Sequence, residues 1–165
     1  STQSRSSAAS DVYKRQLKYA REIGCKTAIV VCNKDSEMAK YSDVAIEVVV
    51  GPEVLTGSTR LKAGTAQKMV LNMISTGSMV AVGKAYQNLM VDVMQTNEKL
   101  VVRAENIVIE ATDCDRDTAR RALKEANGKV KTAVVMILLN CKYDEAEERL
   151  KRAEGHVRFA LENIN

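Results

Sequence analysis

Residues 51–65 read GPEVLTGSTRLKAGT, and this stretch decides the fold because of what lies on either side of it. The apolar segment Val44–Val50 precedes it, and a long segment with helical spacing, from about Thr59 to Val82, follows it. A strand, a glycine-containing turn and a helix in this order are typical of an open parallel α/β sheet. Ligands bind such sheets beyond the carboxyl ends of the strands, so residues 51–65 are the first candidate for a binding site.

The preceding segments extend the same pattern. Leu17, Ala20 and Ile23 share one helical face, and Gly24 is placed to end that helix. The run Thr27–Cys32 is apolar and β-rich, as expected for a strand that is covered on both faces. Helix, strand, loop and strand therefore predict the C-terminal part of a doubly wound parallel sheet. Because two strands alone are marginally stable, we expect the chain to begin within that domain.

The chemistry of the central stretch suggests a cradle for a phosphate group. Gly57 permits a tight turn, and Ser58 and Thr59 place hydroxyl groups beside the first free N–H groups of the helix. Arg60 and Lys62 add positive charge within one turn. The alternative is that the hydroxyl groups cap the helix and the two cations are simply solvated.

Glu53 has two possible roles on the same sequence evidence. Its carboxylate, at the edge of the expected sheet, suits hydrogen bonds to sugar hydroxyl groups. It is also close enough in sequence to form an ion pair with Arg60 or Lys62.

Two longer helices are expected after this stretch. The second half of the helix at 59–82 carries apolar residues nearly all round, which predicts burial on most sides. The segment from Asn97 to Thr112 has an apolar stripe at helical spacing. These helices complete a predicted domain at residues 17–112.

Residues 113–165 predict a small all-helical domain. Asn127-Gly128 ends its first helix, and Val130–Leu138 forms the second. Asp144 and Glu147 have the spacing of a capping box that opens a third helix, which Gly155 closes. Residues 113–143 also resemble a ubiquitin-associated (UBA-like) three-helix fold, although such a likeness does not imply ubiquitin binding.

Residues 1–16, STQSRSSAASDVYKRQ, differ in character from the rest of the chain. They are rich in Ser, Arg and Gln and show no helical or strand period, so we expect a disordered tail. The abrupt change at Leu17 suggests that this tail is foreign to the protein. A native disordered tail is the alternative.

Charge and cysteine content exclude several classes of function. The net charge of +4 divides into +2 for residues 1–16 and +1 for each of 17–112 and 113–165, so no folded region has the cationic face that nucleic-acid binding needs. The four cysteines, at 25, 32, 114 and 141, lack zinc-site spacing, and we expect no metal. Apolar runs are too short to span a membrane, and scattered cysteines are typical of a cytoplasmic protein.

The run GPEVLTGSTRLKAGTAQK, residues 51–68, closely resembles the characteristic motif of one known family. This family shares the sugar isomerase (SIS) fold and comprises the N-acetylmuramic acid 6-phosphate etherases and the glucokinase regulatory proteins. The resemblance continues through Gly83-Lys84, Asn88–Val93 and Thr96–Leu100 into the last helices, and so covers about residues 17–165. The short C-terminal unit matches the bacterial etherase branch better.

The resemblance implies an enzyme that cleaves the D-lactyl ether of N-acetylmuramic acid 6-phosphate during cell-wall recycling. The products are N-acetylglucosamine 6-phosphate and D-lactate, no cofactor is needed, and the enzyme is a homodimer. Its two catalytic glutamates lie in the first half of the SIS domain, which this sequence does not match. We therefore expect no catalytic residue in this chain, and we predict substrate-binding roles for Glu53, Ser58, Thr59, Arg60 and Lys62.

Two other functions remain possible on this evidence: a sugar-phosphate-binding regulator without turnover, and a helical interaction module. His156, the only histidine, lies far from the motif in sequence and is not expected to act in the site. Asp92 and Asn97 suit structural hydrogen bonds better than contacts to a neighbouring subunit's site.

Overall fold

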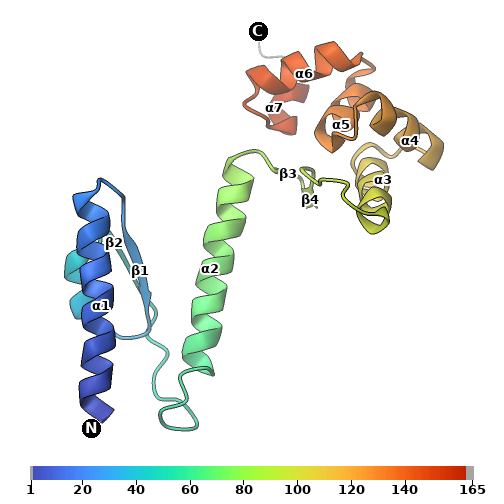
Figure 1. Ribbon diagram of the computed structural model, residues 1–165. Coiled ribbons are helices and arrows are strands. Elements are labelled where there is room, and N and C mark those ends of the chain that lie inside the picture. Colours follow the sequence, from blue (N-terminus) through green and yellow to red (C-terminus); the bar gives the residue numbers. More distant parts are fainter. Residues whose placement is uncertain (1, 163–165) are drawn as a thin grey trace. The chain divides into compact units, whose positions relative to one another are not determined.

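Figure 1 shows the computed structural model, which describes residues 2–162. The described part is a mixed α/β structure that is mostly helical. Its elements, in chain order, are α1 (Thr2–Glu22), β1 (Ala28–Val31), the 3-10 helix η1 (Glu37–Tyr41), β2 (Val44–Glu47), α2 (Lys62–Ala81), β3 (Ala85–Tyr86), β4 (Leu89–Met90), α3 (Glu98–Thr112), α4 (Arg116–Glu125), α5 (Val130–Leu139), α6 (Tyr143–Arg152) and α7 (Val157–Leu161).

The chain divides into two compact units, and the division falls inside α2, between Ile74 and Ser75. We call the part up to Ile74 unit 1 and the part from Ser75 unit 2. Helix α3 belongs to unit 2, because its buried side chains share one core with α4–α7. The boundary expected at residue 112 therefore does not coincide with the boundary between compact units.

Unit 1 contains a parallel pair of strands. Strands β1 and β2 run side by side in register, from Ala28 opposite Val44 to Val31 opposite Glu47. Both predicted strands are thus confirmed, although each is shorter than expected. Only Ile29 and Val31 of β1 are buried, and β2 has no buried residue, so the expectation of cover on both faces is wrong for residues 2–162. A larger doubly wound sheet is not present in this part of the chain.

Helix α1 corrects the expectation for the first residues. Residues 2–16 are helical and continuous with the predicted helix, instead of lacking regular structure. They contain neither Gly nor Pro, so nothing in them stops a helix that propagates from Leu17 towards the N-terminus. The helix ends before Gly24, as predicted. Whether this segment is native to the protein stays a prediction.

Helix α2 forms where it was expected, but its second half is not buried. Ala63 and Val70 are its only buried residues among those described. Apolar side chains on several sides are between 48% and 62% exposed: Met69, Leu71, Met73, Ile74, Met79 and Val80. The expectation of burial on most sides is therefore wrong for this chain. An apolar helix of this kind needs neighbouring elements to cover it, and residues 2–162 provide too few.

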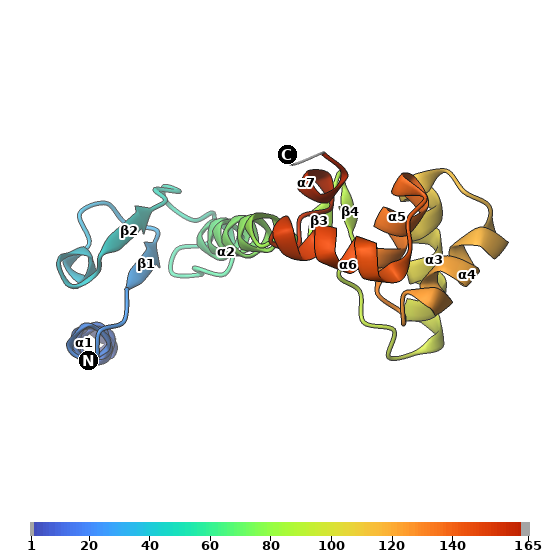
Figure 2. The same cartoon turned by 90° about the horizontal axis from the view of Figure 1, so that it is seen from above.

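Unit 2 is built around one apolar core that α3–α7 enclose. Helix α5 is central, because it contacts α3, α4, α6 and α7 and buries an unbroken run from Thr132 to Met136. Figure 2 shows these helices gathered around one another. The core side chains are small, mostly Ala and Val, which allows the helices to approach closely. The predicted stripe of α3 is confirmed at Ala104, Ile107, Val108 and Ala111.

The turns and caps of unit 2 follow the sequence-based expectations only in part. The helix ends at Asn127-Gly128 and Gly155 are confirmed by left-handed backbone at these residues. The β3–β4 hairpin was not expected. The capping box is wrong, because Lys142 is the N-cap of α6 and the Glu147 carboxylate faces α5 instead. The likeness of residues 113–143 to a ubiquitin-associated fold stays a prediction.

A buried carboxylate joins α3 to α4. The side chain of Glu105 is only 8% exposed, and it accepts hydrogen bonds from Arg116 at 2.7 Å and Arg120 at 2.9 Å. The hydrogen bonds from Arg120 and Arg116 lower the pKa of Glu105. Because the two guanidinium groups pair both carboxylate oxygens, this charge is satisfied inside the unit.

The turn after α2 meets the turn between α6 and α7. Gly83 has a φ of +71°, and a Cβ atom there would lie 2.8 Å from the carbonyl oxygen of Gly155. Beside this contact, the two ring nitrogens of His156 lie 3.2 Å from the carbonyl oxygens of Ala81 and Ala153. The two turns therefore touch through their main chains, and only glycine at position 83 permits this approach.

We predict that Gly83→Ala destabilises unit 2. The added methyl group would overlap with main-chain atoms of Gly155, and the left-handed backbone disfavours alanine by roughly a further 1 kcal/mol. Overpacking of this kind costs about 1–3 kcal/mol. Urea denaturation followed by circular dichroism measures the change in the free energy of unfolding.

Gly77→Ala is the matched control. A Cβ atom at Gly77 meets nothing within 4 Å, and this glycine lies in α2. Replacing a helical glycine with alanine stabilises by about 0.5–1 kcal/mol, so the two variants should change stability in opposite directions. Equal stability of Gly83→Ala and the unchanged protein would contradict the prediction.

Candidate functional site

The candidate site is the loop that joins β2 to α2 in unit 1. Two short turns shape it: the N–H of Ser58 donates to the carbonyl of Leu55 at 3.0 Å, and Gly57 has a φ of +86°. The N–H of Gly64 then donates to the carbonyl of Thr59 at 2.9 Å, which starts the first turn of α2. The glycine therefore serves the tight turn that its sequence context predicted.

The carboxylate of Glu53 is bound to the N-terminus of α2. Its two oxygens accept hydrogen bonds from the backbone N–H groups of Lys62 at 2.9 Å and Ala63 at 3.0 Å. These hydrogen bonds, first that from Ala63 and then that from Lys62, lower the pKa of Glu53. The expected ion pair with Arg60 or Lys62 does not form in the described structure, where Glu53 has main-chain partners instead. Its role towards sugar hydroxyl groups stays a prediction.

The other predicted residues differ in their surroundings. Ser58 is half-buried, and Thr59 is exposed but lines a cavity of about 790 Å³ with parts of α1 and β1. The exposed Arg60 has no hydrogen bond or ion pair within residues 2–162. Lys62 reaches back to the carbonyl of Val50, 3.5 Å from its Nζ. The structure thus places Glu53 and Thr59 in the β2–α2 loop and Lys62 at the start of α2, and it leaves the Arg60 side chain exposed without a described partner.

Two further carboxylates of unit 1 hold main-chain N–H groups, and sequence reasoning missed both. Glu47, at the end of β2, accepts from Asp35 at 3.1 Å and Ser36 at 3.0 Å in the loop after β1. Asp43 accepts from the N–H of Thr27 at 2.8 Å and from its hydroxyl at 2.9 Å. The available signal was a single charged residue, Glu47, within the otherwise apolar run Val44–Val50.

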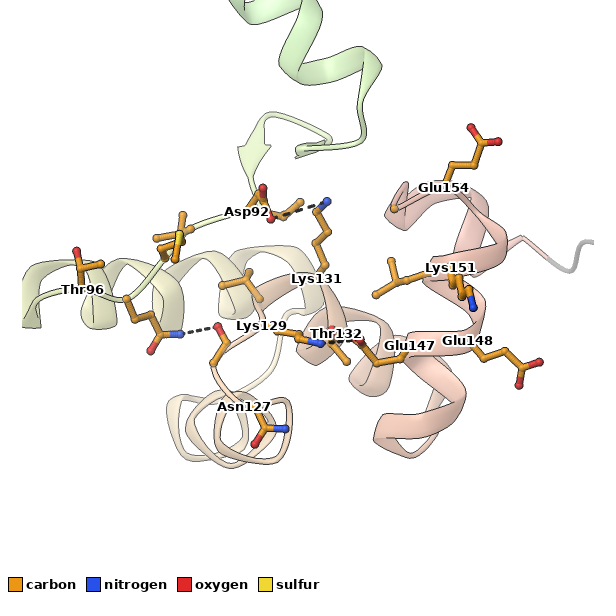
Figure 3. Close-up of a pocket in the computed structure, with 18 residues that line it drawn as sticks. Asp92, Thr96, Asn127, Lys129, Lys131, Thr132, Glu147, Glu148, Lys151 and Glu154 are labelled. Atoms are coloured by element: carbon orange, nitrogen blue, oxygen red, sulfur yellow. Dashed lines mark hydrogen bonds and ion pairs between the residues drawn. The ribbon is translucent and has the colours of Figure 1, made fainter.

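Unit 2 contains a larger cavity of about 1050 Å³, shown in Figure 3. Its charged side chains pair with one another: Lys129 lies 2.6 Å from Glu147, and Lys131 lies 4.0 Å from Asp92. Glu148 and Glu154 point away from these pairs in Figure 3. Because its lining has four acidic and three basic residues, this cavity lacks the concentrated positive charge that would favour a phosphate.

Asp92 and Asn97, for which structural hydrogen bonds were expected, both have partners within the described structure. Asp92 pairs with Lys84 at 3.0 Å, and the side chain of Asn97 caps α3 by accepting from the N–H of Leu100 at 3.0 Å. No cluster of three metal-ligating side chains exists in the described residues. None of the helices between residues 2 and 162 combines the length and apolarity needed to cross a bilayer.

Comparison with known proteins shows a close likeness over most of the chain. No protein-family model matches it. A Geobacillus protein named N-acetylmuramic acid 6-phosphate etherase is 63% identical over 123 residues, which cover 74% of this chain and 42% of that protein. Proteins of the same name from Pectobacterium atrosepticum and Oenococcus oeni are 61% and 58% identical over 124 residues, which cover 75% of this chain and 41% and 42% of those proteins.

The resemblance predicted from residues 51–68 is thus confirmed. The matched region is the C-terminal part of these relatives. The chain spans about two-fifths of the length of the curated relatives it matches.

We predict that Glu147→Gln weakens unit 2 at neutral pH. Partial burial acts to raise the pKa of Glu147, but hydrogen bonds from Lys129 and Thr132 outweigh it and lower this pKa below its ordinary value of 4.5. The carboxylate therefore stabilises the folded state above pH 4.5, and this contribution is lost as the pH falls through the lowered pKa. We expect a loss of about 1 kcal/mol, because the side chain is 34% exposed and solvent screens the pair.

Denaturation with urea at neutral pH and at a pH well below 4.5 measures this effect. The difference between variant and unchanged protein should shrink in acid. Glu148→Gln is the control, because Glu148 pairs only with Arg152 on the exposed surface of α6 and should change stability little. Equal losses of stability in the two variants at neutral pH would contradict the stabilising role of the Glu147 carboxylate.

Proposed function

We propose that this chain is part of an N-acetylmuramic acid 6-phosphate etherase that cleaves the D-lactyl ether of its substrate. The observation that carries the proposal is the identity of 56–63% to proteins of that name over about three-quarters of the chain. The same names favour the enzyme over a regulator without turnover and over a helical interaction module. The substrate class is a sugar phosphate, and the products are N-acetylglucosamine 6-phosphate and D-lactate.

The proposed reaction is an elimination followed by addition of water. A base removes the proton at C2, an acid protonates the departing ether oxygen, and water then adds to the unsaturated sugar. The family resemblance implies that the two glutamates that do this lie in the first half of the SIS domain. Within unit 1, the carboxylates of Glu47 and Glu53 are already bound to main-chain N–H groups, which supports a binding role for this part and a catalytic role elsewhere.

The β2–α2 loop is the proposed site for the substrate's phosphate and sugar groups. Ser58 and Thr59 offer hydroxyl groups, and Arg60 and Lys62 offer positive charge at the N-terminal end of α2, where the helix dipole favours anions. We further propose that the parent protein has the SIS fold and acts as a cytoplasmic homodimer without nucleic-acid partners.

The parent protein should release D-lactate from N-acetylmuramic acid 6-phosphate without added metal. An enzymatic assay for D-lactate measures this with and without a chelator. The 165-residue chain on its own should release none, because the proposed catalytic glutamates are not among its residues. Turnover by the chain alone, or activity that a chelator abolishes and a metal restores, would contradict the proposal.

Arg60→Ala in the parent protein should weaken sugar-phosphate binding by about 1–3 kcal/mol. This is the scale of a hydrogen bond between charged groups, and Arg60 has no partner within residues 2–162 that would compete for it. Calorimetric titration with a substrate analogue measures the dissociation constant.

Lys68→Ala is the matched control, because Lys68 is an exposed cation further along α2. It should leave the dissociation constant unchanged, since its charge lies beyond the first turn of the helix. An unchanged dissociation constant for Arg60→Ala would assign Arg60 a structural role.

A further inference from the structure

The backbone N–H groups of Lys62 and Ala63 are where a helix N-terminus would hold a phosphate. Each donates to one oxygen of the same Glu53 carboxylate, at 2.9 and 3.0 Å. A carboxylate and a phosphate present a similar pair of negatively charged acceptor oxygens. Glu53 lies nine residues before Lys62 and ten before Ala63, so the chain itself supplies an anion at this position.

We propose that Glu53 is a positioning residue that permanently occupies the anion position of α2 and fixes the loop carrying Ser58, Thr59 and Arg60. A bound phosphate then contacts the side chains of that loop and not the N–H groups of Lys62 and Ala63. The identity of the ligand in this proposal rests on the proposed function. The position of Glu53 does not.

The surroundings of Glu53 favour a permanent contact. Glu53 is half-buried and Ala63 is 8% exposed, so water has limited access to the N–H group of Ala63. The contact closes the chain between residues 53 and 62, and the turn from Leu55 to Ser58 lies inside that closure. Both ends of the binding loop are thereby tied to α2, which reduces the conformational freedom that a ligand would otherwise have to remove.

The same geometry argues against the other roles of Glu53. A general acid must carry a proton at working pH, but the N–H donors of Lys62 and Ala63 favour the ionised form and lower the pKa of Glu53. A phosphate at the same N–H groups would place like charges side by side, which is unfavourable unless the carboxylate leaves. A role in binding sugar hydroxyl groups would require oxygens directed at the ligand, whereas both are directed at the helix.

The test uses amide chemical shifts of the full 165-residue chain, measured by NMR. In the unchanged protein, the amide signals of Lys62 and Ala63 should move together with a midpoint below pH 4.5, as Glu53 is protonated. At neutral pH, inorganic phosphate should not reproduce the shifts that protonation of Glu53 causes at these two signals. These measurements need no variant and no turnover, so they are independent of whether the parent protein is an etherase.

Glu53→Ala supplies the second arm. Removing the carboxylate frees both N–H groups, so inorganic phosphate or acetate should now shift the two amide signals saturably. Glu22→Ala is the matched control, because the Glu22 carboxylate makes no hydrogen bond or ion pair within residues 2–162. This variant should respond like the unchanged protein.

The outcomes separate the alternatives. Phosphate shifts at Lys62 and Ala63 in the unchanged protein that match those of Glu53→Ala in direction and size would show that a ligand displaces Glu53 and would overturn the proposal. Amide signals that do not follow a common acid midpoint would also overturn it, because the hydrogen bonds would then be absent in solution. Saturable phosphate or acetate shifts of these signals in Glu53→Ala alone would establish that Glu53 occupies the anion position. A purely structural loss would give no anion-dependent shift.

Discussion

Main-chain N–H groups at the ends of short elements must find acceptors, and carboxylates meet this requirement throughout unit 1. Asp43 holds the residue before β1, Glu47 holds the loop after β1, and Glu53 holds the start of α2. Among residues 11–74, apolar burial is limited to a few side chains, including Ile29, Val31 and Val70. The loops of unit 1 therefore depend on these three acidic side chains more than on an apolar core.

Unit 2 follows a different principle. Its helices are amphipathic or largely apolar, and small residues such as Ala104, Ala119 and Ala133 let them pack closely around α5. Its buried and half-buried carboxylates are paired, Glu105 with two arginines and Glu147 with Lys129 and Thr132. Burial and pairing are thus both satisfied inside the unit, whereas α2 carries exposed apolar side chains that its own neighbours do not cover.

Much of the secondary structure followed from periodicity, because helices with a regular apolar stripe and strands with apolar runs have strong local signals. The ends at Gly24, Asn127-Gly128 and Gly155 were readable from residue type. The role of Glu53 was not, since hydrogen bonds to residues nine and ten positions away depend on how the loop folds. The burial of α2 was misjudged for a related reason. An apolar surface indicates that a helix needs cover, but it does not say whether the cover is present.

The contact between Gly83 and Gly155 has a consequence for how this protein can be modified. Exposed turns between helices are the usual places for inserted peptides or reporter tags, because most of them contact nothing else. The α6–α7 turn is an exception, since its main chain touches the turn after α2 and the Nε2 atom of His156 lies 3.2 Å from the carbonyl oxygen of Ala81. An insertion there would separate two elements that are 75 residues apart in sequence. The same contact makes positions 83 and 155 interdependent, so that a larger residue at one requires a movement of the other.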